Sequence, residues 1–132
     1  MSDAAINIRF DGNGRVYHPG ETLSGEYSLE RIDAGEVRAI EVSILWSTEG
    51  KGDEDLAVHE FRRVSLEGHG HDGSPCRGRF STVLPNSPLS YEGQIIKLRW
   101  CVRVRAFLHG REILGQHRFR LGNVSPAREI KP

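Results

Sequence analysis

Apolar and polar residues alternate most regularly between Ile96 and Ala106. Every even position in this stretch is apolar, including Trp100, and the odd positions are basic except for Cys101. A period of two places successive side chains on opposite faces of a β-strand. We therefore predict a long strand with an apolar inner face and a basic outer face. It closes the stretch 84–107, around which we expect the rest of the chain to be organised.

Weaker alternation predicts strands along the rest of the chain, separated by glycine and proline turn signals. No segment has the 3.6-residue period of a helix. The further strands are predicted at residues 5–10, 15–17, 22–30, 37–48, 57–66, 79–84 and 112–121. In segment 57–66 the inward face stays ambiguous, because Phe61 is out of phase with Val58 and Val64. About eight strands without a helix predict an all-β fold, in which two antiparallel sheets pack as a β-sandwich.

Prolines and one glycine predict how the two sheets meet. Pro85 and Pro88 cannot continue a hydrogen-bonded ladder, so we expect the chain to cross between sheets just before the long strand. Gly25 stands in the middle of a predicted strand. There we expect a bulge, or a close approach by an inward aromatic side chain such as Trp46 or Trp100.

The length of 132 residues predicts one domain. We expect the sandwich to cover residues 1–122 and the proline-containing tail 123–132 to be poorly ordered. No secretory signal is visible at the N-terminus, and no apolar stretch approaches the roughly 20 residues that span a bilayer. Two cysteines, Cys76 and Cys101, do not make a disulfide framework. These features predict a cytoplasmic protein that does not cross a membrane.

Charge is balanced, because 18 Lys and Arg residues face 18 Asp and Glu residues. Neutralisation of phosphates supplies much of the affinity of a DNA- or RNA-binding domain, which therefore usually carries a basic excess. We predict that this protein does not bind nucleic acid.

Two motifs frame the middle of the chain. The first reads Tyr-His-Pro-Gly-Glu-Thr-Leu-Ser-Gly from Tyr17 to Gly25, and the second reads Leu-Pro-Asn-Ser-Pro-Leu-Ser-Tyr-Glu-Gly from Leu84 to Gly93. The alternating strand follows the second motif. In this order and separation they resemble the N-terminal domain of arrestins, over residues 5–121. The resemblance implies a β-sandwich of arrestin-like or immunoglobulin-like type.

The resemblance also implies a class of function, with two departures from the family. Trp100 stands where arrestins usually have tyrosine, and arrestins have two sandwiches in tandem where this sequence has one. The receptor- and phosphate-binding residues of arrestins are therefore not transferred to this chain. What the resemblance implies is a non-enzymatic adaptor, scaffold or regulatory module that binds other proteins and holds no cofactor. Because sheet edges can pair with another chain, a homodimer that replaces the missing second sandwich is a further hypothesis.

Basic side chains mark a candidate binding face on the outer side of the long strand. They are Lys97, Arg99, Arg103 and Arg105, joined by Arg118 and Arg120 on the next predicted strand. In one interpretation they form a solvated face whose charges pair across strands with Glu41, Glu26 or Glu112. In the other they bind a protein partner through an acidic or phosphorylated peptide, or bind a lipid headgroup, since arginine makes bidentate contacts with such anions.

The loop 68–78 suggests an alternative function as a small ligand- or metal-binding β-domain. His69, His71 and Cys76 are the weak candidates for metal ligands. No paired spacing preorganises them, so we favour a solvated loop without a metal. The loop also contains the pattern G-x-G-x-x-G, but no helix start follows it, as dinucleotide binding requires. Cys76 lacks the ordered, electropositive surroundings of a catalytic thiol, and we predict no catalytic residues.

Overall fold

The structure is a computed structural model that describes residues 3–12, 16–50, 54–66 and 75–122. These residues form eight strands and one short 3-10 turn, Ala34–Glu36. The strands are β1 (Ala5–Phe10), β2 (Thr22–Glu30), β3 (Val37–Gly50), β4 (Leu56–Ser65), β5 (Arg77–Val83), β6 (Tyr91–Glu92), β7 (Ile96–Leu108) and β8 (Arg111–Phe119). The all-β prediction is confirmed.

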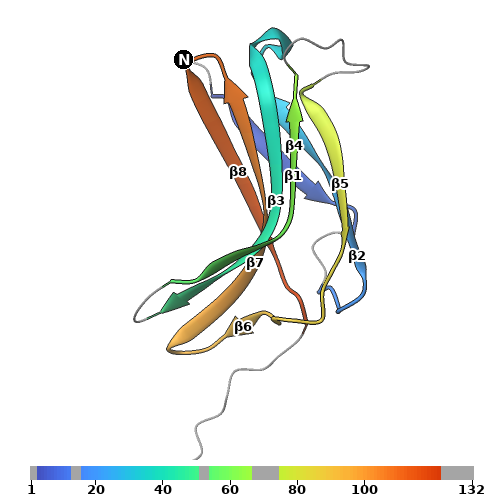
Figure 1. Ribbon diagram of the computed structural model, residues 1–132, viewed down its shortest axis with the longest axis vertical. Coiled ribbons are helices and arrows are strands. Elements are labelled where there is room, and N and C mark those ends of the chain that lie inside the picture. The colour runs from blue at the N-terminus through green and yellow to red at the C-terminus, as the bar shows by residue number, and fades with distance from the viewer. Residues whose placement is uncertain (1–2, 13–15, 51–53, 67–74, 123–132) are drawn as a thin grey trace, which may run out of the picture.

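Two antiparallel sheets face each other, as predicted (Figure 1). The smaller sheet has the strand order β1-β2-β5. In the larger sheet β4, β3 and β7 follow one another, and both β6 and β8 pair with the far edge of β7. The chain crosses from the smaller sheet to the larger one between β5 and β6, which is where Pro85 and Pro88 predicted a crossing.

The core consists of the inward residues of both sheets, as the alternation predicts. Trp100 on β7 is fully buried, packs against Phe119 with ring centroids 5.8 Å apart, and donates its indole N–H to the carbonyl oxygen of Pro88 at 2.7 Å. The other buried core residues of the central strands are Leu23, Tyr27 and Leu29 on β2, Ile40, Val42 and Ile44 on β3, and Val102, Val104 and Ala106 on β7. Ile96 differs from the prediction, because it is 50% exposed at the end of the sheet that bends away from the smaller sheet (Figure 1).

One predicted strand is wrong. Residue 15 lies outside the described residues, and Val16 and Tyr17 of the strand predicted at 15–17 belong to no strand; β1 pairs instead with β2, which places Ile8 opposite Tyr27. Tyr17 takes part in an isolated parallel bridge with Leu121 and not in a strand. The strand that the sequence did not predict is β6, whose two residues are too few to show a period.

A register shift explains the ambiguous face of β4. Between Ile44 and Leu45 on β3 the pairing skips His59, so that this residue is extra in the ladder. Beyond the shift Glu60 and Arg62 face inward with Val64, whereas Phe61 faces outward. Polar residues therefore stand on the inward side of β4, which hides the apolar alternation that a sheet strand usually shows.

The two sheets approach each other closely along β1 and β8. An ideal Cβ built on Gly115 of β8 would lie 2.8 Å from Cβ of Ile6 and 2.9 Å from its backbone oxygen. Within the smaller sheet, Gly25 permits another close approach, because its Cβ would lie 2.3 Å from the oxygen of Arg9 and 2.7 Å from the ring of Phe80. A close approach at Gly25 was predicted, but the aromatic residue is Phe80 and not Trp46 or Trp100.

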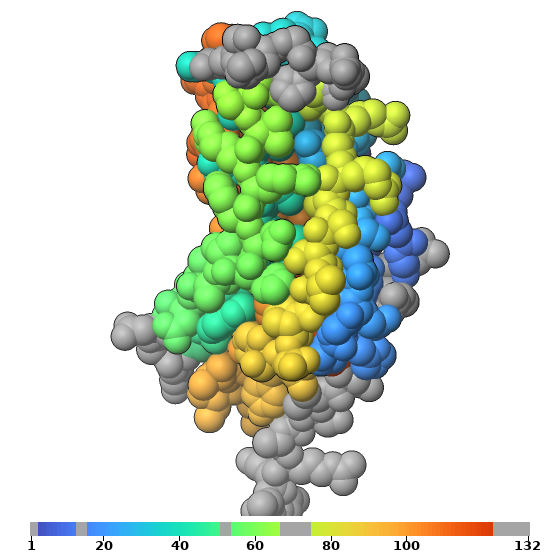
Figure 2. Space-filling model, turned by 45° about the vertical axis from the view of Figure 1, so that its right-hand side comes forward, coloured from blue at the N-terminus to red at the C-terminus, as the bar shows by residue number. Residues whose placement is uncertain are grey.

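Along β4 and β5 the sheets are joined by polar side chains. Arg62 donates to the carbonyl oxygen of Arg79 at 2.5 Å, and Nε2 of His59 donates to that of Val83 at 3.0 Å. Figure 2 looks onto this side of the molecule, where β4 (green) lies beside β5 (yellow). The side chains of one edge strand thus satisfy backbone acceptors of the other.

Replacement of Gly115 by alanine is expected to destabilise the protein by about 1–3 kcal/mol, because the new methyl group would meet the backbone of β1. The free energy of unfolding, measured by urea titration, tests this. Gly35→Ala is the matched control, since its Cβ meets nothing within 4 Å, and it should stay within about 0.5 kcal/mol of the natural protein. Equal stability of the two variants would contradict the close packing of β1 on β8.

Candidate functional site

The predicted basic residues of β7 and β8 lie together on the outer face of the larger sheet. We call this surface the arginine face and define it by Lys97, Arg99, Arg103, Arg105 and Arg118. In Figure 1 the end of the sheet that carries the β3–β4 connection bends away from the smaller sheet. The outer face therefore lies on the inside of the bend, which makes the arginine face concave.

Internal ion pairs neutralise one end of the arginine face. Arg99 donates from Nε to Glu92 at 3.0 Å and from Nη1 to Glu49 at 3.2 Å, and Arg118 lies 3.7 Å from Glu49. The hydrogen bond and charge of Arg99 lower the pKa of Glu92, and Lys97 adds to this effect through its charge. The interpretation of a face with cross-strand ion pairs is thus correct for Arg99 and Arg118.

In the described part of the chain none of the carboxylates named in that interpretation, Glu41, Glu26 and Glu112, forms an ion pair with these arginines. Glu41 binds Arg63 at 2.6 Å, and Glu26 lies 3.8 Å from Arg79 on the smaller sheet. The pairs seen at Arg99 come instead from Glu49 at the end of β3 and from Glu92 on the unpredicted strand β6. Sequence spacing showed neither partner.

The centre of the arginine face carries charge without a carboxylate. Arg103 reaches only the amide oxygen of Gln116, at 3.4 Å, and its Nε is buried with no hydrogen-bond partner among the described residues. Arg105 stands opposite Glu41 in the ladder, but that carboxylate is taken by Arg63. In the described part of the chain no ion pair joins Arg103 or Arg105 to a carboxylate. Their charges are left for a ligand or solvent.

Apolar side chains flank the central arginines. Phe61 on β4 is 55% exposed and shares a row of the sheet with Arg103, whereas Leu114 on β8 is 51% exposed and lies opposite Arg105 in the next row. Leu45 stands in the next row beyond Phe61, opposite Cys101, and is buried although it faces outward. Leu45 could not be assigned to this face from the sequence, because it follows the inward Ile44 and stands at a position of β3 where the alternation predicts a polar residue.

Cys101 is a neighbour of Leu45 on this outer face, and it is also buried. Burial raises the pKa of its thiol, an effect that the nearby Arg103 and Arg118 only partly oppose. The side chain therefore stays protonated at neutral pH and behaves as a small apolar residue. It contributes packing to the arginine face and no nucleophile.

Arg120 lies beyond the end of β8 and joins a different part of the predicted site. Where β8 ends, β6 takes its place beside β7, and a cavity of about 270 Å³ remains. Its lining contains three of the predicted arginines, Arg99, Arg118 and Arg120, together with Glu92. The six predicted basic residues are therefore divided between a sheet face and an adjoining cavity.

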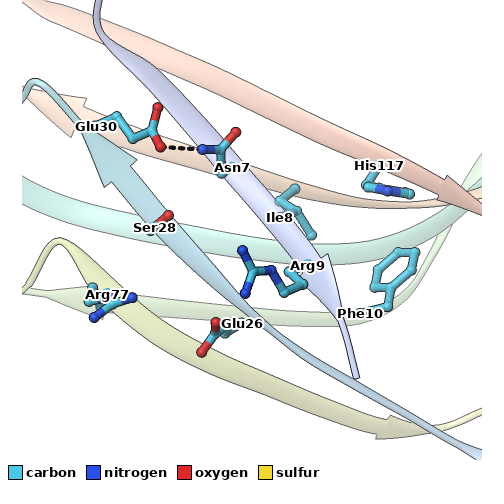
Figure 3. A pocket seen from close by; sticks show the side chains of 9 residues that line it. All are labelled: Asn7, Ile8, Arg9, Phe10, Glu26, Ser28, Glu30, Arg77 and His117. Atoms are coloured by element: carbon cyan, nitrogen blue, oxygen red, sulfur yellow. Dashed lines mark hydrogen bonds between the residues drawn. The ribbon is translucent and has the colours of Figure 1, made fainter. Parts of the chain in front are cut away.

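The other cavity of interest lies on the smaller sheet and contains none of the predicted residues. It measures about 660 Å³, and Figure 3 shows side chains of β1, β2 and β5 around it. Asn7 donates to Glu30 there, and Arg9, Arg77 and Glu26 line the same space. Charges of both signs alternate, so the cavity favours no single class of ligand.

Of the three candidate metal ligands, only Cys76 belongs to the described residues. His69 and His71 lie outside the described residues. Cys76 is half-buried, and its thiol donates to the carbonyl oxygen of Ile32 at 3.6 Å. Among residues 3–12, 16–50, 54–66 and 75–122, no group of three or more His, Cys, Asp or Glu side chains is arranged to hold a metal ion. These same residues contain no helix long and apolar enough to cross a membrane.

Comparison with known proteins shows the fold. Neither the family models nor the curated protein sequences searched gave a match. Among solved structures, the sporulation control protein Spo0M from Bacillus subtilis is similar over 94% of this chain, with a TM-score of 0.62 and 15% sequence identity. The chain spans 51% of the length of Spo0M. The superoxide reductase neelaredoxin from Ignicoccus hospitalis is similar over 89% of this chain and 80% of its own, with a TM-score of 0.53 and 11% identity.

Spo0M has an arrestin-like fold. This agrees with the resemblance to arrestins that the motifs at residues 17–25 and 84–93 indicate. The fold of this chain is accordingly a two-sheet β-sandwich of arrestin-like type, as predicted. At 15% and 11% identity the likeness extends to the fold alone, and membership of the arrestin family is not shown.

Glu92→Gln should remove the pH-dependent part of the ion pair with Arg99. Because the folded state lowers the pKa of Glu92 below its ordinary value of 4.5, the pair stabilises the protein fully above that pH. This stabilisation is lost as the pH falls through the lowered pKa. Near neutral pH the variant should be less stable by no more than about 1 kcal/mol, since both partners are partly exposed.

Urea unfolding of both proteins across the acid range measures this difference. In an Arg99→Gln background the same substitution should have almost no effect, because the partner of Glu92 is then missing. A difference that persists unchanged at acid pH, or in that background, would show that the ion pair is not its source.

Proposed function

We propose that this protein is a non-enzymatic interaction module, of adaptor or regulatory type, that binds an acidic segment of another protein on the arginine face. The observation that carries the proposal is the pair of central arginines, Arg103 and Arg105, which lack a carboxylate partner among the described residues. Carboxylates bind their neighbours Arg99 and Arg118 on the same face.

An anionic ligand would relieve the electrostatic cost of this arrangement. Arg103 and Arg105 are two residues apart on one face of β7, so their like charges repel. Nε of Arg103 is buried without an acceptor, and a buried donor left unpaired costs about 1–3 kcal/mol. A carboxylate or phosphate accepts two parallel hydrogen bonds from one guanidinium, and its negative charge would offset the repulsion between the two arginines.

The flanking apolar side chains define the rest of the ligand. Phe61 and Leu114 stand half-exposed on either side of the arginines, and arginine and aromatic residues are the side chains that contribute most to protein interfaces. A partner segment that places acidic residues at the centre and apolar residues at the two flanks would fit this surface. Carboxylate and phosphate forms of such a segment share the same chemistry and are separated by experiment.

A regulatory role is supported by the fold comparison. The protein of similar fold, Spo0M, is named as a sporulation control protein, and this chain covers about half of it. The buried thiol of Cys101 supports a non-catalytic role for the arginine face. The cytoplasmic location and the absence of an enzymatic activity, both expected from the sequence, belong to the same proposal.

The test measures binding of a fluorescein-labelled peptide of glutamates with one phenylalanine near each end. A second probe replaces the glutamates by phosphoserines, and fluorescence anisotropy reports both dissociation constants. Arg103→Glu combined with Arg105→Glu should weaken binding of the preferred probe by about tenfold or more, because it replaces attraction by repulsion. Arg99 is left unchanged, since its loss would also break internal ion pairs.

The matched control combines Arg9→Glu with Arg77→Glu on the outer face of the smaller sheet, which makes the same change of net charge. This control should bind the probe as the natural protein does. Equal loss in both double variants would mean that only the overall charge attracts the peptide, and the assignment to the arginine face would then be wrong. Failure of both probes to bind the natural protein would also contradict the proposal.

A further inference from the structure

The four longer edge strands of the sandwich differ in what covers them. β1 and β8 cover each other, through the close approach at Gly115. On β5, the carbonyl oxygens of Arg79 and Val83 accept hydrogen bonds from side chains of β4. β4 pairs with β3 on one side, and the described residues place no strand beside its other edge.

Exposed apolar side chains are concentrated along this edge. Of the seven large apolar side chains that are exposed in the described residues, three belong to β4 and one to the end of β5. They are Leu56, Val58, Phe61 and Val83. Scattered apolar residues on a surface are ordinary, but a group along one unpaired edge indicates that a partner covers it.

The charges of β4 make this edge complementary to itself. Glu60 and Arg62 both face inward and are separated only by the outward Phe61. When two copies of β4 pair antiparallel about Phe61, Glu60 of each copy lies opposite the partner's Arg62. The two-fold symmetry makes this pair twice and places the two Phe61 rings side by side.

Other registers are unfavourable. Centring the pair on Glu60, on Arg62 or on Arg63 would place two like charges directly opposite each other. A shift by a single residue would set inward side chains against outward ones, because the face alternates at every residue. The extra residue His59 ends the regular ladder on one side of this segment. Inward charges and a bulge also discourage pairing with unrelated strands, so the edge favours its own copy.

We propose that a second copy of this chain pairs antiparallel with the outer edge of β4 in the register centred on Phe61. Arg62 keeps its hydrogen bond to Arg79, because a guanidinium has five N–H donors and can also bind the partner's Glu60. Glu60 is available, since the hydrogen bond that it accepts from Thr82 within the described residues is long at 3.4 Å.

Pairing joins the two five-stranded sheets into one continuous sheet. Opposite residues of the two strands share a face, so the two-fold axis runs perpendicular to the sheet. Both arginine faces then lie on the same side of the dimer. A dimer can thus bind two acidic segments of one partner, which raises the overall affinity without a new contact. The pairing itself does not depend on the function proposed above.

Exchange of charges between two variants provides the first test. Glu60→Lys and Arg62→Glu each turn the two attractive pairs of the homodimer into repulsive ones. Sedimentation equilibrium should show a monomer–dimer equilibrium for the natural protein and a dissociation constant raised by about tenfold or more for each variant alone. An equimolar mixture of the two variants should regain dimerisation, because every pair across the interface is again of opposite charge.

A natural protein that stays monomeric at every accessible concentration would overturn the proposal. It would also be overturned if the mixture dimerised no better than the variants alone. Circular dichroism of each variant shows whether it is folded, which matters for Arg62→Glu because this change removes the hydrogen bond to Arg79.

Disulfide cross-linking tests the register without that substitution. The symmetry axis sets position 61 against itself, with Cβ atoms about 4.5–5.5 Å apart, so Phe61→Cys should form a covalent dimer under mild oxidation. Cys76→Ser and Cys101→Ala provide the background without other thiols. Arg63→Cys is the control, since its outward position lies off the axis and should cross-link far more slowly. Equal cross-linking at both positions, or none at position 61, would refute the register.

Discussion

The central position of β7 in the larger sheet constrains most of the structure. β7 pairs with β3 along one edge and with β6 and β8 along the other, so its register fixes those of three strands. Its inward side chains, with Trp100 and Val102 fully buried, form the middle of the core, while Arg103 stands on the opposite face. A slip by one residue would bury the arginines and expose Trp100. The same alternation thus stabilises the core and presents the charged face.

The fold was predictable wherever a strand has one apolar and one polar face. β2 and β7 meet this condition; both were predicted as strands, and the inward residues of β7 were identified correctly apart from Ile96. Prediction failed where tertiary contacts override local signals. A short return strand was predicted after Phe10, but β1 pairs along its whole length with the longer strand β2. On β4 the extra residue His59 shifts the phase, and the inward Arg62 satisfies a backbone acceptor on β5, which no local pattern reveals.

The candidate site was predictable in its cations and not in their partners. The two-residue period alone placed Arg99, Arg103 and Arg105 on one face, because all three stand at odd-numbered positions of one strand. Which of them remain without a carboxylate depends on Glu49 and Glu92, and these reach Arg99 through the ladders on both sides of β7. The places of Leu45 and Phe61 on the arginine face were missed for a related reason, since they follow from the pairing of β3 with β4 and β7.

The two sheets meet along β1 and β8 on one side and along β4 and β5 on the other. These two contacts explain why the edge of β4 and the arginine face are connected. Along β1 and β8, Gly115 lets the two backbones approach each other closely, so that little of either strand's edge is accessible to a partner. Where β4 faces β5, side chains of β4 turn inward to satisfy β5. Phe61 therefore turns outward, in the same row of the sheet as Arg103 and separated from it by Ser43. Phe61 therefore belongs both to the edge and to the arginine face. A ligand that contacts Phe61 and a second copy that covers it share this side chain, and by thermodynamic linkage each must change the affinity of the other to the same degree.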